Sequence, residues 1–176
     1  MSGLVNEFAK HDGLRSSQEV ALRRLTLERS PDVEYKDIIQ PDEVTTWVDI
    51  DGSEQPIGPS SWANVMEAKA CAKICDHLIR IAPRKSVVVV VLFSLTRNNP
   101  ERNVGAAGTL QDINVAISRA KEKLIILGNF DMMLNGWTSS PNCTKYYYKS
   151  QARNLARLIE SKYGKIVDPL PQLLVH

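Results

Sequence analysis

The sequence has few of the features that mark special classes of protein. Of its 176 residues only 6% are aromatic and three are cysteines, and basic residues outnumber acidic ones by just two. So few cysteines, in an odd number, exclude a disulfide framework and favour a reducing compartment. Because the chain is nearly neutral, binding of nucleic acid through bulk charge is also excluded, and any such contact would be local.

Long hydrophobic runs are absent as well. No segment approaches the ~20 apolar residues of a membrane span, and the first residues, MSGLVNEFAKHDG, lack the pattern of a signal peptide. We therefore expect a cytoplasmic or nuclear protein without a membrane partner. The cysteine and histidine spacing does not match a zinc site, so no metal ligands are expected.

The small net charge hides two segments of opposite charge. Residues 31–54 contain eight acidic residues and one lysine, whereas residues 142–165 contain six basic residues and one glutamate. We predict a helix over residues 149–163, on which Lys149, Arg153 and Arg157 recur every fourth residue and share one face. This face either is solvated, as on most amphipathic helices, or contacts the phosphates of nucleic acid beside the tyrosines at 146–148.

Hydrophobic periodicity predicts alternating strands and helices. The apolar runs 86–93 and 123–128 are typical of strands buried on both faces of a parallel sheet, and a helical pattern over residues 110–121 connects them. This unit predicts an α/β fold with a parallel sheet of three to five strands and the 86–93 strand at its centre.

Three further elements are predicted. They are a helix over residues 17–29, a strand over residues 45–50, and a helix over residues 62–81 capped by Ser60 or Ser61. The last helix has apolar residues at helical spacing, which predicts that Cys75 is a core thiol. The residues of this predicted buried stripe are Val65, Ala68, Ala72, Cys75, Leu78 and Ile79.

Three segments resemble, in the same order, the motifs of a known family. Residues 114–129 (NVAISRAKEKLIILGN) look like the last conserved motif of superfamily 1 helicases of the nonsense-mediated-decay and senataxin type. Residues 95–99 (LTRNN) resemble the end of the fifth motif region, and residues 60–68 (SSWANVMEA) resemble the helix that opens the second RecA-like domain. The resemblance spans roughly residues 45–165.

The resemblance implies a fold and a division of the chain. The fold is RecA-like, a parallel sheet with flanking helices that corresponds to part of the second domain of P-loop NTPase motors. We accordingly expect a helical or irregular segment over residues 1–40, a partial helicase domain over 41–167 and a tail over 168–176.

The resemblance also implies roles for individual residues. Arg119 would reach the γ-phosphate of ATP held by a facing domain, because a planar, permanently charged fork stabilises that transition state. Asn114 and Lys121 are candidates for further nucleotide contacts. In the family, the loop after the fifth-motif strand faces single-stranded RNA or DNA. The candidates for such backbone contacts are Ser94, Thr96 and Arg97.

Each of these residues also has a simpler interpretation. Arg119 could be a surface arginine paired with Glu122 or Asp112, an arrangement that is common and contributes little stability. The remaining candidates could be solvated side chains of a helix and a loop. Trp62 and Asn64 are predicted to be structural, as an aromatic anchor and a first-turn polar residue.

The sequence lacks the motifs that would allow this chain to hydrolyse ATP by itself. A P-loop reads G-x-x-x-x-G-K-[ST], and the single Gly-Lys pair, Gly164-Lys165, does not fit it. The acidic pair Asp42-Glu43 follows a proline in a loop and is not expected to bind magnesium. A two-domain motor does not fit into 176 residues. ATP and Mg²⁺ are therefore expected only in a complete helicase, with a first RecA-like domain acting in trans, and no cofactor is expected for this chain alone.

The second domain is itself shortened relative to the family. A strand, a helix and a Gln-Gly segment are missing between Ile81 and Ser86, and Gln111 and Asp112 stand where the family carries two arginines. Three functions follow as alternatives. The chain is the C-terminal domain of an ATP-dependent helicase, or a catalytically inactive module that binds nucleic acid or protein through residues 145–165, or a remnant without function.

Overall fold

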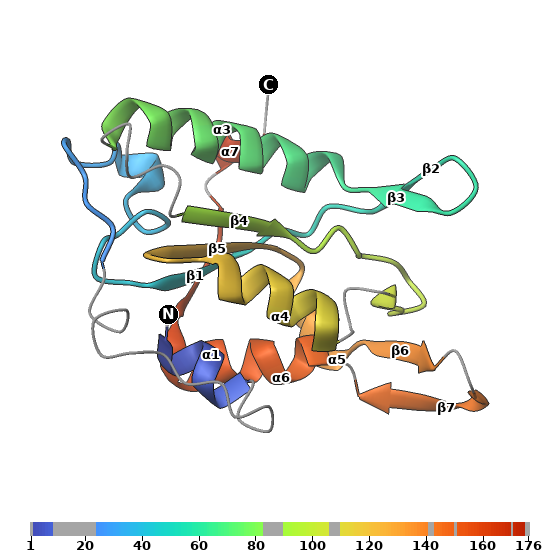
Figure 1. Cartoon of the computed structure of the whole chain (residues 1–176). Coiled ribbons are helices and arrows are strands. Elements are labelled where there is room, and N and C mark those ends of the chain that lie inside the picture. Colours follow the sequence, from blue (N-terminus) through green and yellow to red (C-terminus); the bar gives the residue numbers. More distant parts are fainter. Residues whose placement is uncertain are drawn as a thin grey trace.

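The structure is a computed structural model, and it describes residues 2–8, 24–82, 90–105, 110–140, 143–149, 151–169 and 171–174. Its centre is a four-stranded sheet in the order β4-β5-β1-β8, with every neighbouring pair parallel (Figure 1). The strands are β1 (Thr45–Asp49), β4 (Val90–Ser94), β5 (Lys123–Gly128) and β8 (Lys165–Val167). With its flanking helices this sheet confirms the predicted RecA-like α/β fold.

Helices cover both faces of the sheet (Figure 1). One face carries α3 (Val65–Ile81) and the short α7 (Pro171–Leu174). The other face carries α1 (Ser2–Phe8), α4 (Leu110–Arg119), α5 (Phe130–Asn135) and α6 (Gln151–Leu158), which continues as a π-helical turn over Ile159–Tyr163. A 3₁₀ turn, Val33–Tyr35, precedes the sheet.

The central strand β5 divides the core into two halves. Leu124 and Ile126 pack with α1, α4, α5 and α6, whereas Ile125 and Leu127 pack with α3 and α7. All four side chains are fully buried. This alternation follows from the two-residue period of a strand, and burial on both faces explains why the run KLIILG is continuously apolar.

Two antiparallel hairpins project from one end of the sheet, the end toward which the β4 arrow points in Figure 1. The first pairs β2 (Gln55–Ile57) with β3 (Ser61–Ala63), and the second pairs β6 (Trp137–Ser140) with β7 (Cys143–Lys149). We call this end, where β1, β4 and β5 finish, the carboxyl edge. The opposite end is the amino edge.

The sheet differs from the prediction in one respect. The strand expected at its centre lies at the edge of the described sheet, because β5 is inserted between β4 and β1. Every residue of β4 is accordingly only half buried. The first residues of the predicted strand, 86–89, lie outside the described residues. The strand predicted over residues 45–50 is confirmed as β1, and the strand predicted over 123–128 is confirmed as β5.

Helix α3 begins later than predicted and buries a different face. Asn64 is its N-cap, with a side chain that accepts from the Glu67 amide, and Trp62 lies in β3 instead of the helix. In the predicted stripe, Val65 is 44% and Ile79 58% exposed, and Cys75 is half buried instead of a core thiol. The buried residues are Glu67, Ala70, Ile74, His77, Leu78 and Ile81.

The cause of this rotation is that two polar side chains of α3 find partners in the interior. The His77 ring stacks on Tyr35 with centroids 4.0 Å apart, and its Nε2 accepts from the amide of Asp32. Glu67 contacts the loop after β4. A prediction that assumes polar residues to be exposed therefore assigns the wrong buried face to α3.

Two other predicted helices are wrong in part. Residues 24–29 are not helical, while residues 17–23 lie outside the described residues. Lys149 ends strand β7, and α6 begins only at Gln151, so Lys149 does not share a helical face with Arg153 and Arg157. Within the described ranges, no helix has both the length and the apolar character needed to cross a membrane.

Candidate functional site

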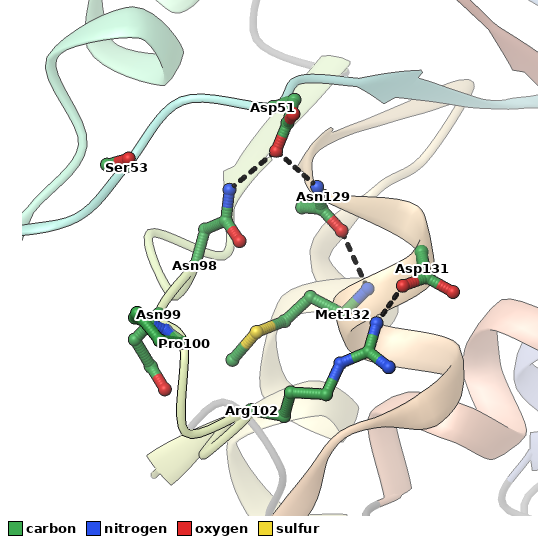
Figure 2. A pocket seen from close by; sticks show the side chains of 9 residues that line it. All are labelled: Asp51, Ser53, Asn98, Asn99, Pro100, Arg102, Asn129, Asp131 and Met132. Carbon is green, nitrogen blue, oxygen red and sulfur yellow. Dashed lines mark hydrogen bonds and ion pairs between the residues drawn. The ribbon is translucent and has the colours of Figure 1, made fainter.

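A polar pocket of about 510 Å³ lies at the carboxyl edge, where the loops after β1, β4 and β5 meet (Figure 2). Open α/β sheets bind ligands at this position, beyond the carboxyl ends of adjacent parallel strands. The residues lining the pocket are Asp51, Ser53, Asn98, Asn99, Pro100, Arg102, Asn129, Asp131 and Met132.

Asp51 joins the three loops. Figure 2 shows its carboxylate between two amides: Oδ1 accepts from Nδ2 of Asn98 at 3.0 Å and from Nδ2 of Asn129 at 2.9 Å. Asn129 is also the N-cap of α5, since its Oδ1 accepts from the amide of Met132 at 2.6 Å. Arg102 and Asp131 form an ion pair at the opposite wall. Apart from the guanidinium of Arg102, which is paired with Asp131, the lining therefore offers mainly carboxylate and amide groups, which suit hydroxyls and amines better than phosphates.

Beside the pocket, the side chain of Glu67 is fully buried and its two oxygens have separate partners. Oε1 accepts from Nδ2 of Asn64 at 3.0 Å. Oε2 accepts from the Ser94 hydroxyl at 2.5 Å and from the Thr96 amide at 2.8 Å. Burial raises the pKa of Glu67 to about 7, although the hydrogen bonds from Ser94 and Thr96 act in the opposite direction.

Thr96 adopts a backbone conformation that β-branched residues rarely take. Its φ is +64°, and the Arg97 amide donates to the Leu95 carbonyl across it at 2.7 Å. A hydrogen bond between residues i+2 and i around a left-handed central residue defines the rare, strained form of the γ-turn. Such strain persists only where surrounding contacts impose it, and it concentrates at functional sites.

Arg97 is held in place by its neighbours. Its Nε lies 3.0 Å from Oε2 of Glu54, and the two side chains are 18% and 4% exposed. Its guanidinium lies 5.0 Å from the ring centroid of Trp62, a cation–π contact. The same Glu54 oxygen accepts from the Asn98 amide at 2.9 Å and from Nδ2 of Asn99 at 3.0 Å. The guanidinium is thus engaged inside the protein.

The structure brings together the three residues predicted to contact nucleic acid after β4. Ser94 and Thr96 are bound to Glu67, and Arg97 is bound to Glu54, all at the carboxyl edge beside the pocket.

The residues predicted to contact nucleotide lie elsewhere. Helix α4 runs antiparallel to β4 and β5, so its last residue, Arg119, and the following Lys121 lie toward the amino edge. Both side chains are exposed, and Asn114 is half buried. The helix is anchored by Ile113 and Ile117, which are fully buried. Among the described residues, no ion pair joins Arg119 to Glu122.

The basic residues of the C-terminal region are spread over two elements. Arg157 is exposed and Arg153 half buried, both on α6. Lys149 is the last residue of β7. The predicted sites are therefore distributed over the carboxyl edge, the end of α4 and α6.

Sequence reasoning missed the acidic residues that organise the carboxyl edge. Two signals were available. Asn64-x-x-Glu67 has the spacing of a helix-capping box, and Asn98 and Asn129 each follow an apolar strand at the edge where α/β proteins bind ligands. No local pattern indicates that Glu67 is buried.

A comparison with models of protein families gives a match to part of the chain. The family model described as "AAA domain" matches residues 88–131, a quarter of the chain. The matched segment runs through β4, α4 and β5 to the first residues of α5, and it includes several residues of the pocket. No curated protein matches the sequence. Together, the family match and the parallel sheet support a helicase-like domain with a nucleotide-binding type of fold.

Proposed function

We propose that this chain is the second, C-terminal RecA-like domain of a superfamily 1 helicase-like protein of the nonsense-mediated-decay and senataxin type. In this proposal it supplies Arg119 to ATP bound on a first RecA-like domain and contacts single-stranded nucleic acid. The observation that carries the proposal is the placement of Arg119. The side chain of Arg119 is exposed at the C-terminal end of α4, and Ile113 and Ile117 anchor this helix in the core.

The chemistry of phosphoryl transfer suits such a placement. Charge spreads over the oxygens of the transferred phosphoryl group, and a preorganised arginine stabilises it without reorganisation during the reaction. Asn114 and Lys121, on and just after the same helix, would contact the nucleotide. ATP and Mg²⁺ would be held by the first domain, because this sequence has no P-loop. Gln111 and Asp112 leave Arg119 as the main phosphate contact.

The test is complementation in trans. The chain is added to the isolated first RecA-like domain of a relative, and phosphate release is measured at increasing chain concentration. We expect ATP turnover to rise at least about tenfold, as expected for a supplied arginine finger. Arg119→Ala should abolish the gain, and Arg119→Lys should recover little of it, because lysine lacks the planar fork. Arg80→Ala, at an exposed arginine of α3, is the control. No gain at any concentration would overturn the proposal.

A second candidate is a nucleic-acid-binding module without a role in catalysis. One observation favours it: Arg157 on α6 is exposed, whereas Arg97 at the carboxyl edge is engaged by Glu54 and Trp62. Binding of fluorescein-labelled oligo-U and oligo-dT would be measured at several salt concentrations. Affinity that falls steeply with salt, and is lost in an Arg153→Glu/Arg157→Glu variant, supports α6 as the contact surface. Binding that does not change with salt would contradict it.

A further inference from the structure

The strained turn at Thr96 has no support from its own sequence. Threonine is β-branched and disfavours a positive φ, and neither neighbour is a glycine. The turn therefore needs an external contact to persist. That contact comes from Glu67, 29 positions earlier in the chain, whose Oε2 binds the Thr96 amide and the Ser94 hydroxyl on either side of Leu95.

A carboxylate is an expensive group to place at this position. Glu67 is fully buried, and no lysine or arginine among the described residues pairs with it. An amide or an apolar side chain would avoid the loss of hydration. Neither could accept from both sets of donors, since Asn64 presents an amide to one side and the loop presents a hydroxyl and a backbone N–H to the other.

The orientation of Asn64 makes this need for two acceptors strict. Its Oδ1 accepts from the Glu67 amide, and its Nδ2 donates to the Gly52 carbonyl as well as to Glu67. A flip of the Asn64 side-chain amide would break its contacts with the Glu67 amide and the Gly52 carbonyl. Nδ2 therefore stays directed at Oε1 of Glu67. Only a side chain with two acceptor oxygens satisfies both the helix start and the loop.

We propose that Glu67 is the positioning residue of the loop at 94–97, holding it in the left-handed turn from which Ser94 and Thr96 contact a single strand of nucleic acid. The inference rests on the proposed function, because it assigns the loop a nucleic-acid partner. The turn also sets the path of the chain into the pocket, since Arg97 and Asn98 follow it directly and are fixed to Glu54 and Asp51.

The first measurement concerns the contact alone and uses NMR of the full chain. An amide that donates to a carboxylate shifts when that carboxylate is protonated, so the Thr96 amide should titrate with a midpoint near the pKa of about 7 raised by burial of Glu67. The groups facing Glu67 are Ser94 at the end of β4, the amides of Leu95 and Thr96, Asn64 at the N-cap of α3, and Cys71 within α3. The Cys71 thiol stays neutral, because burial raises its pKa to about 11. The titration should vanish in Glu67→Gln.

The second measurement is the affinity for a fluorescein-labelled oligo-U strand. Glu67→Gln, which leaves one acceptor for two sets of donors, should weaken binding about tenfold. Glu67→Ala, which removes both acceptors, should weaken it at least as much. The matched control is Asn64→Ser, which keeps an N-cap side chain and removes the two contacts of Nδ2, to Oε1 of Glu67 and to the Gly52 carbonyl, but leaves the contacts of Oε2 with the loop in place. This control should change affinity by less than about twofold.

A double-mutant cycle separates positioning from a general loss of structure. Glycine adopts a positive φ without strain, so in a Thr96→Gly background the turn no longer depends on Glu67. There, Glu67→Gln should weaken binding by less than about threefold. An equal loss in both backgrounds would overturn the inference.

The outcomes for the two proposals are distinct. If the wild-type chain binds no strand, the proposed nucleic-acid contact fails, and the role of Glu67 fails with it, even where the Thr96 amide titrates. If the wild type binds and the Glu67 variants bind equally well, only the inference about Glu67 is overturned. If a Glu67 variant does not fold, the NMR titration of the wild-type chain tests the contact instead. A chemical shift of the Thr96 amide that does not change with pH would contradict the contact.

Discussion

Two buried charges of opposite sign lie at opposite edges of the same sheet. At the amino edge, Lys123 begins β5, and its Nζ donates to the carbonyls of Gln40 and Glu43 at 3.1 and 2.5 Å and to the Thr46 hydroxyl at 3.1 Å. At the carboxyl edge, Glu67 accepts three hydrogen bonds. Both side chains are fully buried. Burial lowers the pKa of Lys123 to about 8 and raises that of Glu67 to about 7.

The backbone around the two charges differs. Among the described residues, no positive φ occurs in the loop that Lys123 binds, over residues 40–46. At the carboxyl edge, Thr96, which is bound to Glu67, has a φ of +64°, and Arg102, which lines the pocket of about 510 Å³, has a φ of +56°. Strain next to a cavity is typical of functional sites. The comparison therefore assigns Lys123 to stability and Glu67 to the shape of the loop beside the pocket.

The largest effect should come from the amino edge. Lys123→Ala would leave two partly buried carbonyls and a buried hydroxyl without their donor and would open a cavity. We expect the free energy of unfolding to fall by about 4 kcal/mol, from the sum of an unsatisfied polar cluster and lost packing. Urea unfolding followed by circular dichroism measures this. Lys121→Ala, two residues earlier and exposed, should change stability by less than about 0.5 kcal/mol. A similarly small loss of stability for Lys123→Ala would contradict the stabilising role of Lys123 at the amino edge.

The next effect is a pH dependence that belongs to the carboxyl edge. The pKa of Glu67 is about 7 in the folded chain and 4.5 as its ordinary value, so the folded state binds more protons between these values. Stability therefore falls as pH rises from about 5 to 8, by about 3 kcal/mol at 1.36 kcal/mol per pKa unit. Urea unfolding at pH 5 and pH 8 should show this loss in the wild type relative to Glu67→Gln. Parallel pH profiles for the two chains would contradict it.

A third change weakens the second acidic anchor of the carboxyl edge. Glu54→Gln would remove the charge that faces Arg97 and one of the acceptor interactions of the loop at 97–99. We expect a loss of about 2 kcal/mol, because both partners are largely buried. Asp76→Asn is the matched control. Its pair with Arg80 is exposed on α3, so its loss should cost less than about 0.5 kcal/mol. Equal effects would show that the loop does not depend on Glu54.

These differences explain which parts of the structure the sequence predicts. The strands β1 and β5 and the helix around Ile113 and Ile117 follow from the sequence pattern, because most of the buried side chains there are hydrophobic. The buried polar exceptions in the two strands are Thr45, Thr46 and Lys123. The face of α3 was predicted wrongly because Glu67 and His77 are polar and buried, and their partners lie in distant segments.

The candidate site could be predicted only where it coincides with a motif. Ser94, Thr96 and Arg97 were found through the resemblance of LTRNN, but their partners Glu67 and Glu54 lie 27 and 43 positions away from Ser94 and Arg97. Long-range hydrogen bonds and a left-handed turn leave no periodic signal in the sequence. The pocket was missed for the same reason, since its lining comes from three loops and the start of α5.

The smallest expected effect tests whether the strain at the carboxyl edge is real. Arg102 has a φ of +56° and forms an exposed ion pair with Asp131, with side chains 46% and 63% exposed. Both Arg102→Ala and Arg102→Gly lose this pair, which contributes little. Only glycine relieves the left-handed backbone, so Arg102→Gly should be more stable than Arg102→Ala by about 1 kcal/mol. Thermal unfolding of the two variants measures the difference. Equal stability of the two variants would show that the backbone at Arg102 is not strained. The carboxyl edge would then not differ from the edge at Lys123 in this respect.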